Sequence, residues 1–217
     1  MGQTLKPILT IMTGPQGSGN HLFSKALGQN KNIFVWPKLQ EKYWEGHDLE
    51  PFAEYWKDPS KLKEFDWKQS NYFITSISCP YFDDGVETIP AYENFIKNAR
   101  EFAEIQFLII GRDSNILKLQ QERVRDKFTT PYFMKELSNI ISHYKTIFAS
   151  QEMLYLYKLH YLKWLEEELG LHPIEITSDD SKLTEILSND ANEKYISQAE
   201  SDLDETIKLA SSRKGAI

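Results

Sequence analysis

Short apolar runs alternate with mixed apolar and polar stretches along most of the chain. Residues 7–12, PILTIM, are almost entirely apolar and are followed by Gly14-Pro15, a pattern typical of a buried parallel strand. Residues 106–114, QFLIIGRDS, form the clearest run of this kind. Similar patterns predict strands at residues 33–36, 71–78, 152–159 and 174–177. The stretches between them predict helices at residues 21–27, 91–105, 115–128, 130–148 and 160–171.

Strands that alternate with helices predict an α/β fold, in which a central parallel sheet carries helices on both faces. The chain has 217 residues, enough for one compact domain, and we expect residues 1–217 to form a single domain. Residues 37–69 are rich in Trp, Tyr and charged residues and are predicted to be an insert. Its aromatic residues form either a wall of a binding site or a small core of their own. From about residue 178 the sequence is a polar C-terminal tail.

Composition narrows the possible partners. The net charge of -7 argues against binding to nucleic acid or to an anionic membrane surface. The single cysteine, Cys79, excludes an internal disulfide framework and suits a reducing compartment. The apolar run near the N-terminus is too short for a membrane span, so we expect no membrane span and a cytoplasmic protein.

The sequence GPQGSGN, residues 14–20, lies between a predicted strand and a predicted helix. Glycines allow a tight turn whose backbone N–H groups converge on an anion, and the helix adds the positive end of its dipole. The alternative is a glycine-rich turn that binds nothing. In Mg-nucleotide enzymes such a loop ends in Lys followed by Ser or Thr, but here the residues are Asn20 and His21. Only Asp113 comes close to the strand-end acid of such enzymes, so we expect no metal site.

A second feature follows the run at residues 106–111. Arg112 is predicted to lie at the same edge of the sheet as the glycine loop, and its guanidinium suits bidentate contact with a phosphate. The alternative is an ion pair with Asp113 or another acid. The two features together favour a phosphate site.

These two motifs resemble those of the sulfotransferases that use 3'-phosphoadenosine 5'-phosphosulfate (PAPS). The resemblance implies a three-layer, P-loop NTPase-like α/β fold and PAPS as the cofactor. It also implies that the loop binds the 5'-phosphosulfate and that the strand-end Arg and a residue eight positions later bind the 3'-phosphate. In this sequence the implied cofactor-binding residues are Gly17, Ser18, Gly19, Asn20, His21, Arg112, Ser114 and Gln120. Two positions depart from the family pattern: Gly17 replaces a Lys and Gln120 replaces a Ser.

The implied activity is transfer of a sulfuryl group from PAPS to a hydroxyl or amine of a small-molecule or carbohydrate acceptor. The residues expected to assist catalysis are His21, Lys25 and His47. Other candidates for the base are Glu45, Ser76, Ser78, Asp83 and Asp84, whereas structural roles are expected for His143, His160 and His172. Two alternatives stay open: a nucleotide or small-molecule kinase with a degenerate loop, and a non-catalytic binding protein with a P-loop-like fold.

Overall fold

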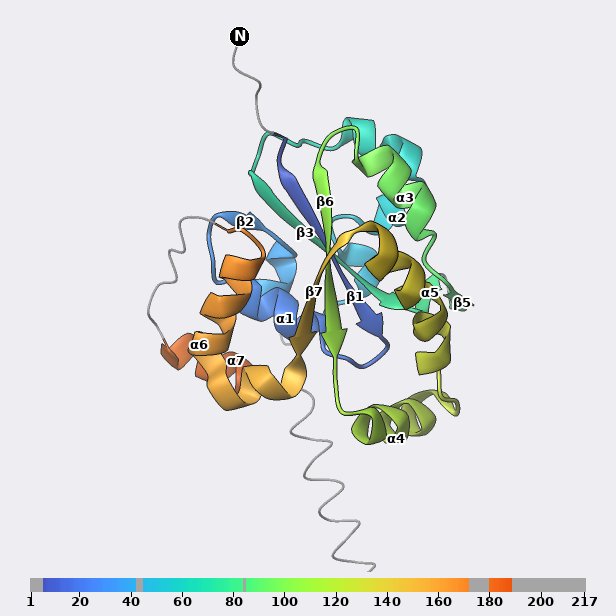
Figure 1. Cartoon of the computed structure of the whole chain (residues 1–217), viewed down its shortest axis with the longest axis vertical. Helices are drawn as coiled ribbons and strands as arrows, with labels where there is room; N and C mark the ends of the chain where they lie inside the picture. The colour runs from blue at the N-terminus through green and yellow to red at the C-terminus, as the bar shows by residue number, and fades with distance from the viewer. Residues whose placement is uncertain (1–5, 42–44, 84, 172–179, 189–217) are drawn as a thin grey trace, which may run out of the picture.

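The computed structural model of the chain describes residues 6–41, 45–83, 85–171 and 180–188. Its centre is a five-stranded sheet in which neighbouring strands run parallel. In order across the sheet the strands are β2 (Ile33–Phe34), β3 (Tyr72–Cys79), β1 (Ile8–Pro15), β6 (Glu104–Gly111) and β7 (Lys145–Ser150). The predicted α/β fold with a parallel sheet is thereby confirmed. The arrowheads of β1, β6 and β7 point to one edge of the sheet (Figure 1), and parallel sheets bind ligands at this carboxyl edge.

Helices and short turns connect the strands. The helices are α1 (Asn20–Leu27), α2 (Ala53–Lys57), α3 (Tyr92–Ala99), α4 (Ser114–Arg125), α5 (Thr130–His143), α6 (Gln151–Glu168) and α7 (Asp180–Ser188). Three 3-10 turns, η1 (Pro37–Gln40), η2 (His47–Leu49) and η3 (Pro59–Glu64), and a hairpin of β4 (Tyr81–Asp83) and β5 (Val86–Thr88) complete the elements. Nowhere in the described part of the chain is a helix both long and apolar enough to cross a membrane.

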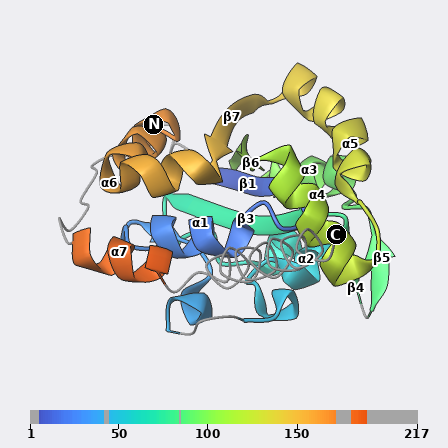
Figure 2. The ribbon, with the colours of Figure 1, turned by 90° about the horizontal axis from the view of Figure 1, so that it is seen from below.

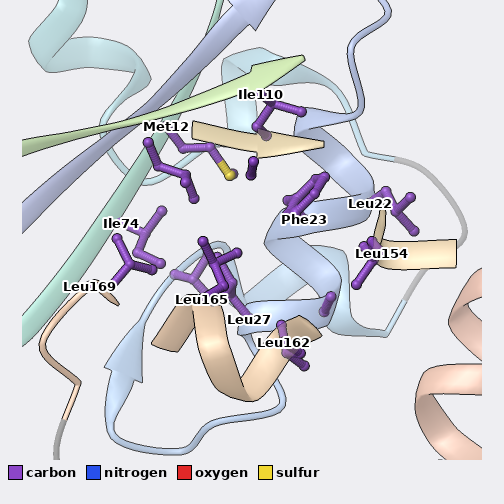
Figure 3. Close-up of a cluster of buried hydrophobic side chains, with 14 of the residues drawn as sticks. Met12, Leu22, Phe23, Leu27, Ile74, Ile110, Leu154, Leu162, Leu165 and Leu169 are labelled. Carbon is purple, nitrogen blue, oxygen red and sulfur yellow. The ribbon is translucent and has the colours of Figure 1, made fainter. Parts of the chain in front are cut away.

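Side chains of the strands alternate between two cores, one on each face of the sheet. On one face Met12, Ile74 and Ile110 pack against α1, α6 and α7. Figure 3 shows Phe23 and Leu27 of α1 meeting these strand residues and the leucines of α6. On the opposite face β1, β3 and β6 pack against α2, α3 and α5. Seen toward the carboxyl edge, the two groups of helices lie on opposite sides of the sheet (Figure 2).

The aromatic insert packs into the second core rather than forming a core of its own. Phe52 and Trp56 are buried there, and the Trp56 ring stacks on Phe95 of α3 with the centroids 3.9 Å apart. Trp67 stacks in the same way on Phe102 at 5.9 Å. Burying several large aromatic rings contributes strongly to stability. Much of the insert is therefore structural.

Near residue 150 one predicted helix is too long and one predicted strand is wrong. The predicted helix 130–148 ends at His143, and β7 follows, with Ile147 and Ala149 buried and Phe148 exposed. The predicted strand 152–159 is the first half of α6, because the Ser150 hydroxyl accepts the Met153 N–H and caps a helix there. Pairing with β6 and capping by Ser150 override the local apolar pattern.

Smaller differences concern element ends. The predicted helix 91–105 stops at Ala99, since residues 104–111 join the sheet as β6. The β4–β5 hairpin has strands of only three residues and is absent from the sequence-based prediction. The predicted strand 174–177 lies outside the described residues.

The core on the α1 face yields a stability prediction. Leu165 of α6 is fully buried, so Leu165→Ala should lower the free energy of unfolding by about 2–5 kcal/mol. Leu156 lies on the same helix and is 72% exposed, so Leu156→Ala should change it by less than about 0.5 kcal/mol. Urea denaturation of the two variants measures the difference. Equal losses would contradict the packing of α6 described above.

Candidate functional site

The glycine loop leaves β1 at the carboxyl edge and turns directly into α1. A Cβ on Gly14 would lie 2.4 Å from the carbonyl oxygen of Ile110 and 2.6 Å from Ser18 Oγ, so the turn requires glycine there. Gly17 and Gly19 have φ of +87° and +115°, the left-handed region that glycine tolerates best. The Ser18 N–H donates to the carbonyl oxygen of Pro15 at 3.1 Å and closes the turn. The three glycines of the motif are therefore explained by backbone geometry.

The start of α1 offers hydrogen-bond donors to a ligand. Gly19 is the N-cap residue and has no side chain, so no N-cap side chain occupies the first backbone N–H groups of α1. Asn20 is buried and its Nδ2 donates to Ser78 Oγ at 3.3 Å. Within the described part of the chain, Asn20 Oδ1 and Ser18 Oγ are buried without a hydrogen-bond partner. N–H groups at a helix N-terminus and a hydroxyl that can donate suit a bound anion, whereas the amide oxygen of Asn20 can only accept a hydrogen bond.

Arg112 reaches the loop from the end of β6. One of its guanidinium nitrogens donates to the carbonyl oxygen of Gly17 at 3.3 Å and to Gln120 Oε1 at 2.6 Å. The predicted cation and the residue eight positions later thus meet beside the loop. Ser114, at the first position of α4, is exposed. Asp113 is used as the N-cap of α4, where its Oδ1 accepts the N–H groups of Asn115 and Ile116.

A buried glutamine of α4 holds the loop in place. The Gln121 side chain donates from Nε2 to the carbonyl oxygen of Gln16 at 2.7 Å, and its Oε1 accepts the N–H of Thr129 at 2.8 Å. Thr129 in turn donates from Oγ1 to Gln16 Oε1 at 3.1 Å. This buried network ties the loop to the start of α5, although nothing in the sequence pattern marked Gln121.

The predicted catalytic histidines lie side by side just beyond the loop. The ring centroids of His21 and His47 are 4.7 Å apart, and the buried Trp36 ring is about equally close to both. His21 Nε2 donates to the carbonyl oxygen of Glu45 at 2.9 Å. Burial, His21 and Arg125 together hold the pKa of His47 well below its usual value, so its imidazole is neutral at pH 7. Lys25 lies one turn beyond His21 on the same face of α1 and is half-buried.

The other candidates for the base have separate positions. Ser78 contacts Asn20, and Asp83 of β4 forms an ion pair with Lys57 of α2. The ring of His143, on the exposed face of α5, contacts the carbonyl oxygen of Asn139, and His160 lies within α6. Asp84 and His172 lie outside the described residues.

One carboxyl group that the sequence did not single out closes the outer edge of β3. Strand β2 pairs only with Tyr72 and Phe73, so the later part of β3 lacks a neighbouring strand on that side. The Glu50 side chain lies where that strand would be: its Oε1 accepts the Ser76 N–H of β3 at 3.0 Å. Its Oε2 accepts the N–H of Phe52 in the insert at 2.7 Å. Beside it is a small pocket of about 70 Å³ that includes His47 and Ser76 in its lining. The sequence pattern does not indicate this role for Glu50, because the strand that it contacts is distant in the sequence.

No protein-family model matches the chain, and no curated protein matches it. Among solved structures, it is similar to the sulfotransferase domain of the olefin synthase from Synechococcus, with a TM-score of 0.44 and 12% identity over 78% of this chain and 75% of that domain. It is also similar to an unliganded sugar kinase from Janibacter, with a TM-score of 0.41 and 10% identity over 77% of this chain and 96% of the kinase. At such low scores neither likeness says what this chain binds or does.

The position of Gly17 yields a prediction about the loop. A Cβ there would lie 2.9 Å from Gln120 Oε1 as well as requiring a positive φ. Gly17→Ala should therefore cost about 1–2 kcal/mol for the backbone, plus the displacement of Gln120 from Arg112. Gly85→Ala is the matched control, because Gly85 has φ +81° and nothing within 4 Å of its Cβ.

Thermal denaturation of both variants, alone and combined with Gln120→Ala, separates the two costs. Gln120→Ala should remove the excess cost at Gly17 and leave the cost at Gly85 unchanged. If the excess persists without the Gln120 side chain, the proposed steric conflict is wrong.

Glu50 yields a prediction about pH. Burial raises its pKa from 4.5 to about 8, against the opposing effect of its two backbone N–H partners. Between these values the folded state keeps a proton that the unfolded state has lost, so the free energy of unfolding falls as pH rises toward 8. The depressed pKa of His47 acts in the opposite direction, but only below its usual value of 6.5.

Urea denaturation from pH 6.5 to 8 should show the wild type losing stability relative to Glu50→Gln, which cannot titrate. Glu54, an exposed carboxyl on α2, provides the control variant Glu54→Gln, whose curve should run parallel to that of the wild type. Parallel curves for Glu50→Gln as well would show that Glu50 does not carry this pH dependence.

Proposed function

We propose that the glycine loop and Arg112 bind the phosphate groups of an adenine nucleotide, and that the chain is a PAPS-dependent sulfotransferase. The observation that carries the proposal is the contact between Arg112 and Gln120 beside the Gly17 carbonyl oxygen. The resemblance assigns this pair of positions to the 3'-phosphate. A guanidinium and a side-chain amide, whose Nε2 is a donor, form a small set of donors for such a group.

The residues present fit an anion at the loop. The N-cap residue of α1 has no capping side chain, and the neighbouring Ser18 hydroxyl, which can donate, is buried without a partner among the described residues. Asn20 and His21 stand where the loops of Mg-nucleotide enzymes have Lys followed by Ser or Thr, and both side chains contact other parts of this protein. Asn20 contacts Ser78, and His21 donates to the Glu45 carbonyl oxygen. Charge on the ligand would therefore be met by backbone N–H groups and by Arg112.

PAPS, when bound, would supply the sulfuryl group for transfer to an acceptor. The roles of the chain's own residues follow from their positions. Arg112, Gln120 and the loop N–H groups would hold and orient the nucleotide. The neutral imidazole of His47 lies beside the start of α1 and could take the proton of an acceptor hydroxyl. An anion at the loop would raise the pKa of His47 by offsetting the neighbouring positive charges, which makes it a better base.

A thermal-shift comparison tests the proposal. We expect 3'-phosphoadenosine 5'-phosphate to stabilise the protein without metal, by about 5–10 °C at about 100 times its Kd. ADP, which lacks the 3'-phosphate, should stabilise it less, and Mg²⁺ should not be needed. If ATP with Mg²⁺ is the only stabiliser, the protein is better described as a kinase with a degenerate loop. If no adenine nucleotide stabilises it, the binding of nucleotide is refuted.

Substitutions at Arg112 test whether this residue binds the nucleotide. Arg112→Ala should weaken binding of the bisphosphate about 10- to 100-fold, because it removes charge-assisted hydrogen bonds. Arg112→Lys keeps the charge but not the fork of donors and should give an intermediate loss. Arg100 is exposed at the end of α3, before β6 begins at the opposite edge of the sheet, so Arg100→Ala should bind like the wild type. Equal binding by Arg112→Ala and Arg100→Ala would exclude Arg112 from the site.

A further inference from the structure

The small pocket beside His47 is closed by three separate segments of the chain. The insert contributes His47 and Trp56, the outer edge of β3 contributes Ser76, and the β4 strand contributes Tyr81 and Asp83. Its volume of about 70 Å³ is enough for a few water molecules, since about 10–15 Å³ of such space suffices for one. It can therefore admit a hydroxymethyl group or one edge of a sugar ring.

Two of the three carboxyl groups that line the pocket already have partners, and the third, Asp48, is exposed. Asp83 is paired with Lys57, and both carboxyl oxygens of Glu50 accept backbone N–H groups. A second cation, Arg125, lies over the Phe82 ring, 5.5 Å from its centroid. Apart from the exposed Asp48, a cationic ligand would find no carboxylate without a partner, and an anionic ligand would find Lys57 already paired. A neutral ligand group suits this lining best.

One polar group in the lining still needs a partner. Ser76 is 4% exposed, and its Oγ has no hydrogen-bond partner within the described part of the chain. A buried hydroxyl without a partner costs free energy that a ligand hydroxyl would recover. Trp56, Tyr81 and Phe82 also line the pocket, and aromatic side chains pack well against the C–H groups of sugars.

We propose that this pocket binds a hydroxyl-bearing end of a carbohydrate, with Ser76 and His47 as its hydrogen-bond partners. Its role as the acceptor site rests on the transferase function proposed above, because His47 contacts His21 at the start of α1. A hydroxyl bound beside His47 lies next to the anion loop rather than at a remote position. The binding itself does not depend on the nucleotide.

NMR titration of the full-length, isotope-labelled protein with D-glucose tests the pocket, and ethylammonium serves as the cationic probe. D-glucose should cause saturable shifts at the Ser76 N–H and the Trp56 indole N–H, and ethylammonium should not. Ala53, which lines the pocket on α2, offers a way to fill it: Ala53→Leu should weaken glucose binding at least about tenfold. Ser76→Ala should weaken it about fivefold, the value of one hydrogen bond. Ser142→Ala, on the exposed face of α5, should bind like the wild type.

The thermal shift with 3'-phosphoadenosine 5'-phosphate is measured on the same variants. Ala53→Leu should keep the nucleotide shift, which shows that it is folded and that only the pocket is blocked. If 3'-phosphoadenosine 5'-phosphate causes no thermal shift in the wild type while glucose still binds, the transferase function is refuted but the pocket is not. Three results would overturn the pocket: no saturable effect of glucose, an unchanged glucose affinity in Ala53→Leu, or binding of ethylammonium instead.

Discussion

The site depends first on the missing side chain at Gly14. A Cβ there would meet the Ile110 carbonyl oxygen at 2.4 Å, and because that oxygen belongs to the backbone of β6, it could move only with the strand. With glycine, β1 and β6 keep their spacing while the loop folds back over the end of β1. Arg112, two residues beyond Ile110, then reaches the carbonyl oxygen of Gly17. A larger residue would push the loop and Arg112 apart, so the proposed anion site and the close packing of the two strands both require glycine at position 14.

The second constraint is the short strand β2. Because it pairs with only two residues of β3, the chain must satisfy the remaining edge in another way. The insert does so with the carboxyl group of Glu50, which accepts the Ser76 N–H. The Trp56 indole N–H also attaches the insert to β3 by donating to the side-chain oxygen Oγ1 of Thr75 at 3.0 Å. Side chains do not fill the space as completely as a strand would, and the small pocket beside His47 remains. The pocket is thus a consequence of how the sheet ends.

Much of the fold follows from local sequence, and much of the site does not. The runs that become β1 and β6 are apolar because both faces of these strands are buried, so their pattern is unambiguous. At the edge of the sheet the signal is weaker: β7 exposes Phe148, and the apolar pattern after Ser150 fits either a strand or a helix. Arg112 could be predicted because strand ends share one edge of a parallel sheet. Glu50 could not, because it reaches the backbone of β3 only where the short strand β2 leaves that edge open.

The positions where this loop differs from the phosphate-binding loop of Mg-nucleotide enzymes are also the ones that attach it to the rest of the protein. Asn20 contacts the end of β3, and His21 contacts the insert through the Glu45 carbonyl oxygen and the His47 ring. A lysine at position 20 would place a cation where a buried amide now bonds to Ser78. At position 17 the left-handed backbone and the nearby Gln120 leave little room for any side chain. These residues connect the loop to the strand and the insert. In the proposed site, the backbone N–H groups and Arg112 are therefore the groups that would meet a ligand's charge. The insert that stabilises β3 also places His47 beside His21 at the start of α1.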